Sequence, residues 1–261
     1  MSTPAKENES RRVDFLGCPM DLLTSETFLD EAKSAIENKS ESRVVQFVNA
    51  NKVAKISEDK EFGDLMWRAD YVLTDGLPMM PLARMLHIDV PERIDGIGLM
   101  GKLLQLANEN SFSVYLLGAK QEVLEACVEK IGKDFPGVKI VGYRNGYFKR
   151  EEAASIAADI AELRPDMLFL GMGSPTKEEL ADEFKDSCGA TIIQGVGGSF
   201  DVMAGLVKRA PNWVQQIGFE WFYRVMQEPR RMFWRYATTI SRCLAVFSRA
   251  FCSRHFTPVK R

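Results

Sequence analysis

Residues 194–236 read QGVGGSFDVMAGLVKRAPNWVQQIGFEWFYRVMQEPRRMFWRY, a stretch that starts polar and glycine-rich and becomes basic and aromatic. It begins as the expected end of a buried strand and turns through Gly195, Gly197 and Gly198. Such a turn lets backbone N–H groups approach a phosphate, and the helix start that follows favours negative charge. A tight strand-to-helix connection that binds no ligand fits these glycines about equally well.

Arginines and aromatic side chains dominate the chain after this turn. The arginines are Arg209, Arg224, Arg230, Arg231 and Arg235. Together with the glycine turn they suggest a phosphate-bearing ligand held between a sheet edge and a basic tail.

The charge of the chain is small in total but unevenly distributed. The net charge is −2 at pH 7, which excludes a generally basic nucleic-acid-binding protein. From residue 219 onward, nine Lys or Arg and two Glu give +7, which leaves −9 for the 25 Lys or Arg and 34 Asp or Glu before it. The tail therefore predicts an anionic partner: a membrane surface, nucleic acid or pyrophosphate.

The cysteines and the lengths of the apolar runs indicate the compartment in which the protein works and its relation to the membrane. The five cysteines form no CxxC or His–Cys spacing, which suits a reducing cytosol. We expect residues 1–12 to be a disordered polar start, because they contain no signal-peptide core. No run reaches the ~18 apolar residues of a spanning helix, so we expect a soluble or peripheral protein.

Short apolar runs alternate with helical patterns, which predicts an α/β fold with a Rossmann-like doubly wound sheet over residues 13–218. In helix 120–133 we expect Val123, Ala126, Cys127 and Ile131 to pack on the sheet. The expected strands are 13–17, 43–48, 71–74, 113–117, 138–141, 167–170 and 191–194, and the expected helices include 25–38, 97–108, 120–133, 151–163 and 176–185. Ligands of open α/β sheets bind at the carboxyl ends of the strands, where several glycines follow.

Residues 219–261 are expected to form a basic amphipathic helical appendage. Arg242 and Arg249 are seven residues apart and share nearly the same helical face, beside aromatic residues. This pattern is typical of a helix that lies in a membrane interface. The alternative is a helical hairpin that packs on its own domain and leaves its arginines in solvent.

Polar residues at predicted strand ends are the candidates for chemistry. Asp75, before Gly76, can act as a general base or cap the next helix. Asn49 and Asn51 can bind sugar hydroxyls or a diphosphate, or cap a helix, with neither role favoured. For Asp95 capping is favoured, and Lys177 can reach ligand oxygens.

The sequence lacks the residues for a Ser-His-Asp triad and for a metal-clamped diphosphate. His87 and His255 are isolated, and no serine has a histidine base in a recognisable motif, which argues against a Ser-His-Asp triad. No Asp-x-Asp occurs, which argues against a metal-clamped diphosphate. We therefore expect no metal and no other cofactor, and we expect arginines and backbone N–H groups to stabilise a leaving diphosphate.

Four motifs resemble those of the WecG/TagA/CpsF family of bacterial glycosyltransferases, in the family's order. They are VNANKV (48–53), ADYVLTDGLP (69–78), LFLGMGSPTKEE (168–179) and GVGGSFDVMAGLVKRAPNW with GFEWFYRVMQEPRR (195–231). The resemblance implies an inverting, metal-independent transferase that docks its appendage on the inner face of the cytoplasmic membrane. It implies transfer of a hexose or N-acetylhexosamine, such as ManNAc, from a UDP-sugar to a polyprenyl-diphosphate-linked sugar, usually GlcNAc, in cell-surface polysaccharide or exopolysaccharide synthesis.

The motifs also imply roles for individual residues. Asp75 matches the family's candidate base, and Asn51 matches an asparagine of the acceptor or sugar pocket. Asn49 stands where many members have threonine, Lys177 and Glu178 stand at a Gln-Glu pair, and Gly98 stands where members often have Asp. Arg224 and Arg231 match appendage arginines, while a third such position falls on Trp234, beside Arg235. The residues expected to bind substrate are Asn49, Asn51, Gly76, Asp95, Lys177, Gly195, Gly197, Gly198, Asp201, Arg209, Arg224, Arg231 and Arg235.

Several alternatives stay open. The donor can be UDP-ManNAc, its uronic acid or UDP-glucose, and a homo-oligomer is one candidate assembly. A non-enzymatic nucleotide- and membrane-binding adaptor would also use the basic tail. A nucleotide-binding oxidoreductase is disfavoured, since GVGGSF lacks the third glycine of GxGxxG and lies late in the chain.

Overall fold

The computed structural model describes residues 11–76, 79–207, 210–211, 214, 223, 225–226 and 229–252. In the last helix, side chains are described from Thr238 to Ala250. Several residues discussed from the sequence lie outside the described part of the chain: Arg209, Arg224, His255 and residues 1–10.

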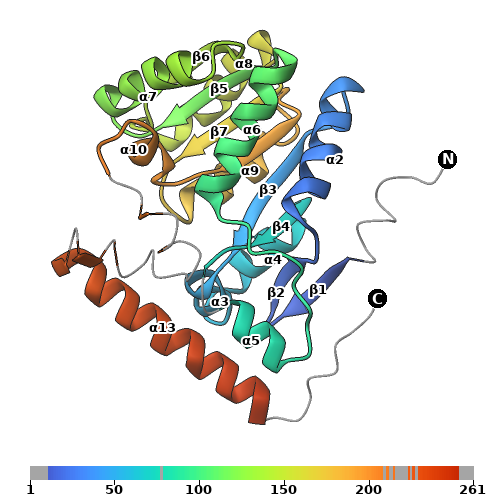
Figure 1. Cartoon of the computed structure of the whole chain (residues 1–261), viewed down its shortest axis with the longest axis vertical. Helices are drawn as coiled ribbons and strands as arrows, with labels where there is room; N and C mark the ends of the chain where they lie inside the picture. Colours follow the sequence, from blue (N-terminus) through green and yellow to red (C-terminus); the bar gives the residue numbers. More distant parts are fainter. Residues whose placement is uncertain are drawn as a thin grey trace.

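Six parallel strands form the central sheet (Figure 1). Their order across the sheet is β4 (Tyr71–Thr74), β3 (Arg43–Val48), β8 (Ile192–Gly195), β7 (Met167–Gly171), β5 (Ser113–Gly118) and β6 (Lys139–Arg144). Parallel pairing requires crossover connections, which the intervening helices supply. The predicted Rossmann-like doubly wound fold is confirmed.

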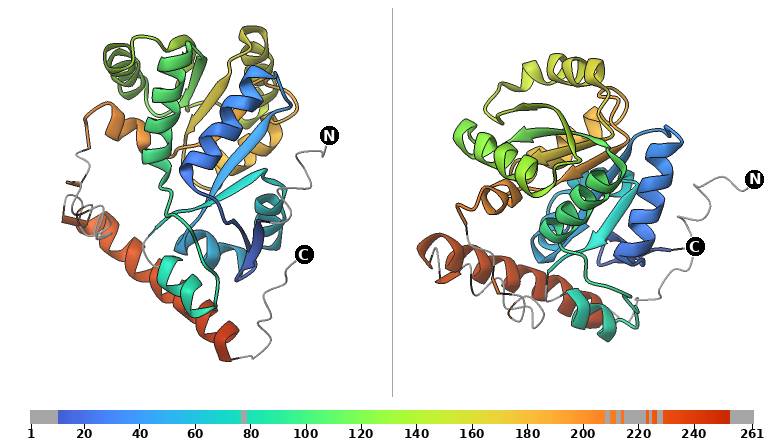
Figure 2. Two further views of the ribbon diagram at one scale, coloured as in Figure 1. Left: turned by 45° about the vertical axis from the view of Figure 1, so that its right-hand side comes forward. Right: turned by 45° about the horizontal axis from the view of Figure 1, so that its top comes forward.

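Helices cover both faces of the sheet (Figure 2). Side chains alternate along each strand, so that Val45 and Phe47 of β3 join one buried cluster and Val44 and Val48 join the other. The first face carries α2 (Ser25–Glu37), α6 (Gly96–Asn110), α7 (Gln121–Asp134) and α10 (Ser199–Met203). The second carries α4 (Lys60–Arg68), α8 (Ala153–Leu163) and α9 (Thr176–Phe184), and a 3₁₀ turn, η1 (Arg150–Glu152), precedes α8. Its hydrophobic cluster continues into α3 (Ala50–Ile56), α5 (Met79–Met85) and α13 (Pro229–Cys252), which lie at one end of the molecule (Figure 1).

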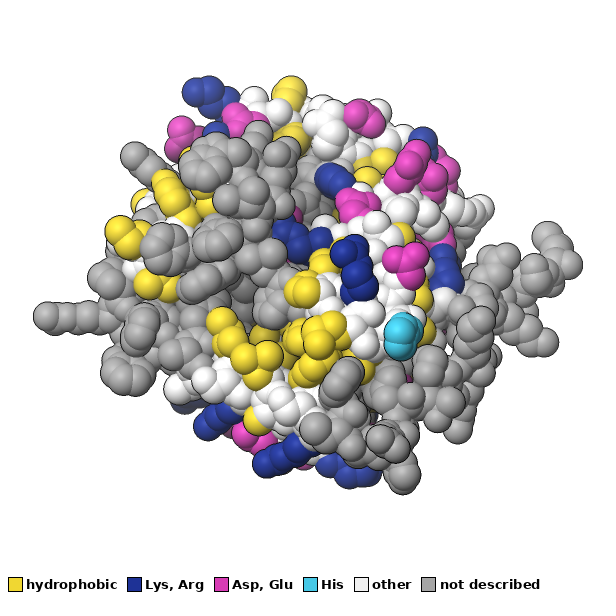
Figure 3. All heavy atoms as spheres, turned by 60° about the horizontal axis from the view of Figure 1, so that its bottom comes forward, with side chains coloured by type: hydrophobic (Ala, Val, Ile, Leu, Met, Phe, Trp, Pro, Cys, Tyr) yellow, Lys and Arg dark blue, Asp and Glu magenta, His cyan; other side chains and the backbone are white. Residues whose placement is uncertain are grey.

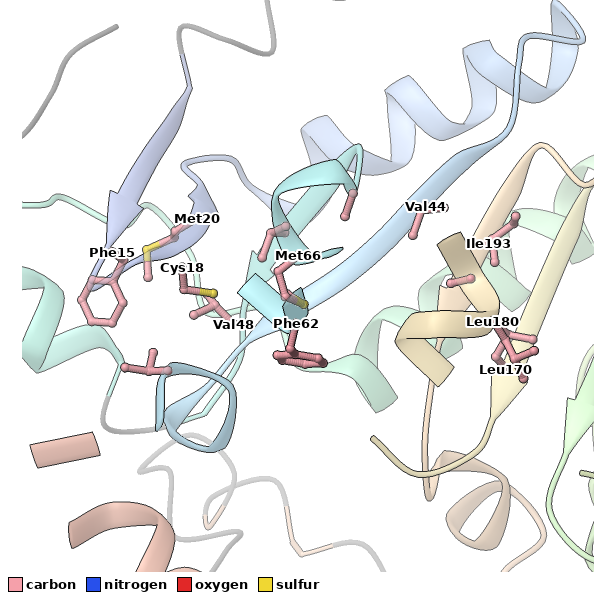
Figure 4. Packing of buried hydrophobic residues seen from close by; sticks show 14 of the residues in the cluster. Phe15, Cys18, Met20, Val44, Val48, Phe62, Met66, Leu170, Leu180 and Ile193 are labelled. Carbon is pink, nitrogen blue, oxygen red and sulfur yellow. The ribbon is translucent and has the colours of Figure 1, made fainter. Parts of the chain in front are cut away.

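The core of the second face is continuous from α9 to the N-terminal strands (Figure 4). Leu180 of α9 lies with Leu170 and Ile193 of the central strands, and all three are fully buried. Buried aliphatic side chains of this kind stabilise the fold by roughly 1.5–3 kcal/mol each relative to exposure.

A β-hairpin precedes the sheet, where the sequence predicted one strand over residues 13–17. Strand β1 (Arg12–Phe15) pairs antiparallel with β2 (Cys18–Asp21). Leu16 and Gly17 both have positive φ, 57° and 85°, as a two-residue hairpin turn requires. The single-strand prediction is wrong because leucine in the first turn position gives no turn signal.

Hydrogen bonds from Arg12 connect this hairpin to the residues that precede β4. Its guanidinium donates two hydrogen bonds to Asp21, at 2.8 and 2.7 Å, and others to the carbonyls of Ala69 and Asp70. Asp21 also accepts a hydrogen bond from the N–H of Val72. The buried carboxylate is therefore fully paired, which offsets its desolvation.

Helix α7 lies where the sequence predicted a helix, but its buried face differs from the predicted one. In α7 the buried residues are Leu124, Cys127 and Ile131, and Val123 and Ala126 are only partly buried. The packed face therefore keeps Cys127 and Ile131 from the predicted set and has Leu124 in place of Val123 and Ala126. Part of Val123 faces a cleft instead of the sheet.

Helix α13 lies against α3 (Figures 1 and 2). Its Cys243 and Phe247 are buried in the same cluster as Ala50 and Val53 of α3. None of the described helices is long and apolar enough to cross a membrane.

Candidate active site

The carboxyl ends of β5, β7 and β8 surround a cleft of about 410 Å³. The turn after β8 is fixed against β7, since the N–H groups of Val196 and Gly197 donate to the carbonyl of Leu170 at 2.9 and 3.3 Å. The cleft is lined by Ala119, Lys120, Val123, Tyr147, Gly171, Met172, Gly173, Gly197, Gly198 and Asp201. Of the predicted binding residues, Gly197, Gly198 and Asp201 line it.

Glycines allow the strands and α10 to approach closely beneath this cleft. A Cβ at Gly118, whose φ is +141°, would lie 2.5 Å from the carbonyl of Gly171. A Cβ at Gly171 would lie 2.3 Å from the ring of Phe200. Any side chain at either position would push β5, β7 and α10 apart, so the shape of the cleft depends on both glycines.

The start of α7 opens into the same cleft. Lys120 is its N-cap residue and makes no side-chain capping hydrogen bond. The N–H groups of a first helical turn carry partial positive charge, and they favour an anionic ligand when no side chain caps them. Sequence reasoning missed Lys120 and Tyr147. The available signal was Gly118, which follows a strand.

Asp75 follows β4, two strands away from the glycine turn. Its N–H donates to the carbonyl of Val48 at 2.9 Å, and a Cβ at Gly76 would lie 3.7 Å from the Cβ of Asn49. The structure thus brings Asp75, Gly76 and Asn49 together. Because β3 alone separates β4 from β8, about 10 Å separates Asp75 from the glycine turn, which leaves room for a sugar ring.

Two of the predicted binding residues cap helices. Asn49 accepts a hydrogen bond from the N–H of Lys52 at 3.1 Å, at the start of α3. Asp95 accepts one from the N–H of Gly98 at 2.7 Å, at the start of α6. Asn51 is exposed in the first turn of α3. The substrate-binding roles of these three residues stay predictions.

The carboxylate of Asp95 occupies the space beside Gly98. A Cβ at residue 98 would lie 2.6 Å from Oδ2 of Asp95, closer than any side chain tolerates. The glycine and the cap therefore depend on each other. Hydrogen bonds from Ile94 N–H to Thr74 and from Gln194 to Gly96 place this turn over β4 and β8.

A buried ionic cluster lies beside the glycine turn. Lys52 of α3, 3% exposed, is 2.8 Å from Glu178 of α9, 0% exposed. Lys177 is 3.8 Å from the same carboxylate and donates to the carbonyl of Gly195 at 3.3 Å. Burial alone would raise the pKa of Glu178, but the charges of Lys52 and Lys177 outweigh it and hold that pKa below its usual value.

The arginines of the tail are only partly placed. Arg231 and Arg235 lie in α13, but their side chains are outside the described part of the chain, as are Arg209 and Arg224 entirely. Arg242 is described and lies 3.6 Å from Glu58, beyond the end of α3. Within the described residues, no group of three or more His, Cys, Asp or Glu side chains is placed to hold a metal ion.

Comparison with known proteins identifies the family. Residues 13–256 match the model of the glycosyl transferase WecG/TagA/CpsF family. The chain belongs to this family. It is therefore an enzyme, a glycosyltransferase, as the four motifs predicted.

Curated members of the WecG/TagA/CpsF family match over most of the chain. An N-acetylglucosaminyldiphosphoundecaprenol N-acetyl-beta-D-mannosaminyltransferase of Bacillus subtilis (strain 168) is 31% identical over 215 residues, 82% of each chain. Enzymes with the same name from Bacillus spizizenii and Staphylococcus aureus (strain MW2) are 30% and 29% identical. These matches cover 88% of this chain and 86% and 90% of those enzymes.

Proposed function

We propose that this glycosyltransferase transfers N-acetylmannosamine, or a related hexose, from a UDP-sugar to a polyprenyl-diphosphate-linked GlcNAc. The observation that carries the proposal is the arrangement of one sheet edge, where a glycine-lined cleft and the Asp75 turn lie two strands apart. The names of the relatives supply the sugar and the lipid-linked acceptor. The UDP donor rests on the family resemblance and on the chemistry of the cleft.

The donor diphosphate lies beside the turn at Gly197, against the N–H group of Gly198 and the start of α7. These groups and Lys120 present positive charge without a carboxylate cap at the helix start. Lys177 adds a cation next to Gly197, because its Nζ would lie 3.6 Å from a Cβ atom placed on that glycine. The leaving diphosphate is then stabilised without a divalent cation.

Asp75 acts as the general base in a single displacement. Its carboxylate takes the proton of the acceptor hydroxyl while that oxygen bonds to the anomeric carbon and the bond to the UDP oxygen breaks. The hydroxyl attacks from the face opposite the leaving group, so the anomeric centre inverts. This chemistry requires Asp75 and the diphosphate on opposite sides of the sugar, as a separation of two strands permits.

The lipid-linked acceptor approaches over the end of the molecule formed by α5 and α13. Figure 3 views this end and shows hydrophobic side chains gathered together, with both basic and acidic side chains around them. Met85 of α5 is 53% exposed and Leu244 of α13 is 45% exposed. Exposed apolar residues beside α13, which contains five arginines and no acidic residue, suit the surface of a membrane that contains anionic lipid, and the enzyme works there as a peripheral protein on the cytoplasmic face.

Release of UDP by the full-length protein in detergent tests the proposal. UDP-ManNAc, its uronic acid, UDP-GlcNAc and UDP-glucose are each supplied with and without a short polyprenyl-diphosphate-GlcNAc acceptor, in EDTA. We expect acceptor-dependent release with UDP-ManNAc, and NMR of the product gives the configuration at the new bond. Release only with another donor changes the sugar, whereas release only after Mg²⁺ is added contradicts metal independence. Failure to bind any UDP-sugar contradicts the donor assignment.

A further inference from the structure

The buried cluster beside the glycine turn contains two ammonium groups and one carboxylate. Glu178 has no solvent exposure, and its Oε1 lies 2.8 Å from Lys52 and 3.8 Å from Lys177. Lys52 also donates to Oε1 of Gln46 at 3.4 Å. Ionised groups are costly to bury, and a site that buries both partners of this pair needs a reason beyond packing.

The two lysines differ in what else they face. Lys52 is enclosed by β3 and α9, with Gln46 and Glu178 as its partners. Lys177 donates instead to the carbonyl of Gly195 and passes beside Gly195 and Gly197, the glycines of the turn after β8. Of the two cations, Lys177 is therefore the one that lies against the glycine turn, which borders the cleft.

We propose that the Lys52–Glu178 pair is a positioning device that keeps Lys177 directed at the glycine turn. Lys52 forms the closer ion pair with Glu178, at 2.8 Å. Lys177 therefore stays 3.8 Å from that carboxylate and keeps its hydrogen bond to the carbonyl of Gly195. The cluster then has one net positive charge, and that charge lies beside Gly197. This inference rests on the proposed function, because it assigns that charge to the diphosphate of the donor.

Removal of Lys52 alone gives the sharpest expected result. In Lys52→Met the buried carboxylate loses its closest partner, and an unpaired buried charge is strongly destabilising. Lys177 is the nearest remaining cation, so it moves onto Glu178 and leaves the turn. We expect UDP to bind at least tenfold more weakly, while uridine, which lacks the diphosphate, binds as it does to the wild type.

A double variant separates positioning from simple structural support. Lys52→Met with Glu178→Met removes both charges and fills a similar volume, so Lys177 has no buried carboxylate to move to. We expect the affinity for UDP to return to within about threefold of the wild type. If the pair only supported the fold, the double variant would bind UDP as weakly as Lys52→Met or more weakly. Lys52→Arg keeps the charge and retains the wild-type affinity.

The measurements use calorimetry with UDP and uridine on the full chain, and thermal unfolding reports stability for each variant. The matched control is Arg68→Met, which breaks the ion pair at the protein surface between Arg68 of α4 and Asp182 of α9, the helix that carries Glu178. It leaves the affinity for UDP unchanged. The resonance of ¹³C-methylated Lys177 provides a second signal: we expect it to shift in Lys52→Met and to return in the double variant.

These outcomes separate the inference from the proposed function. If the wild type binds no UDP, the proposed donor is wrong, and the Lys177 resonance still decides whether the pair positions that side chain. Unchanged UDP affinity in a folded Lys52→Met variant overturns the inference, as does loss without recovery in the double variant. If Lys52→Met does not fold, Glu178→Gln takes its place: UDP affinity at or above the wild-type value supports positioning, and a tenfold loss contradicts it.

Discussion

Asp75 is placed by backbone contacts. Its own N–H is bonded to Val48, and the next residue, Gly76, has a φ of +86°, which turns the chain sharply away from the sheet. The position of the Asp75 backbone is therefore set by the strand end and the turn. An isosteric amide at this position should occupy the same place without the ability to take a proton.

We expect Asp75→Asn to lower turnover by about 10²–10⁴-fold, the usual contribution of a general base. The affinity for UDP should stay nearly unchanged, since the proposed diphosphate contacts lie two strands away. Acceptor-dependent UDP release and calorimetry measure the two quantities. Asp134→Asn, on the exposed end of α7, is the control for a generic loss of one carboxylate. Wild-type rates from Asp75→Asn would remove Asp75 as the base.

The sequence predicted which residues end the strands, but not which of them act together. That Asp75 and Gly195 lie at the same edge of the sheet could be predicted, because parallel strands bring their carboxyl ends to one edge. The partnership of Lys52 with Glu178 could not, because it depends on β3 lying beside β8, an order that no local pattern reveals. Asn49 and Asp95 show a further limit, since the residue types that cap helices also bind sugars.

Among the elements, α13 shows features of both alternatives that the sequence left open, a helix at a membrane interface and a helix packed on its own domain. Its buried side packs on α3, with Phe247 6% exposed, while Leu244, Arg242 and Arg249 are exposed. The described part of the tail therefore packs on its own domain and still presents cations to solvent. Removing the whole tail would also uncover α3, so single substitutions on α13 test its role more cleanly than truncation.

Phe247→Ala should release α13 from the domain. Loss of a buried phenylalanine costs roughly 3–5 kcal/mol in a core, and less where the site borders solvent, as here. Because α13 contacts mainly α3, we expect its amides to lose hydrogen-exchange protection while those of β3 and β7 keep theirs. Leu244→Ala, an exposed position on the same helix, is the control and should leave protection unchanged.

The opposite result would be informative about the architecture. If Phe247→Ala lowers protection equally in α13 and in the central strands, the helix unfolds together with the domain. The tail would then be part of the folding unit of the sheet, and the expected boundary at residue 218 would not separate two units.

Strands were predicted better than short helices. Strands 43–48 and 71–74 match at both ends, because continuous apolar runs with clear flanks define them. Helix α4 was not among the predicted ones, and α3, α5 and α10 were expected only as helix starts after Asn49, Asp75 and the glycine turn, without bounds. Each has five to nine residues, fewer than three turns, so the helical period barely repeats within them.

At the scale of the whole molecule, the uneven charge gives the protein a preferred orientation. Residues 1–218 carry −9 and residues 219–261 carry +7, and α13 itself contains five arginines and no acidic residue. An anionic surface repels the domain and attracts the tail. The end of the molecule that bears α13 would then face the membrane, with the sheet edge close to the lipid-linked acceptor.

We expect the protein to bind vesicles that contain anionic lipid and to bind neutral ones weakly, with affinity that falls as salt rises. Arg242→Gln with Arg249→Gln should weaken binding about 30-fold, since each arginine near such a surface contributes ~1 kcal/mol. Cosedimentation measures this. The matched control is Arg144→Gln with Arg150→Gln, which removes the same charge beside β6, at the far edge of the sheet from β3 and α3 (Figure 1). Equal losses from both pairs would mean that only net charge matters, and would contradict an oriented docking through α13.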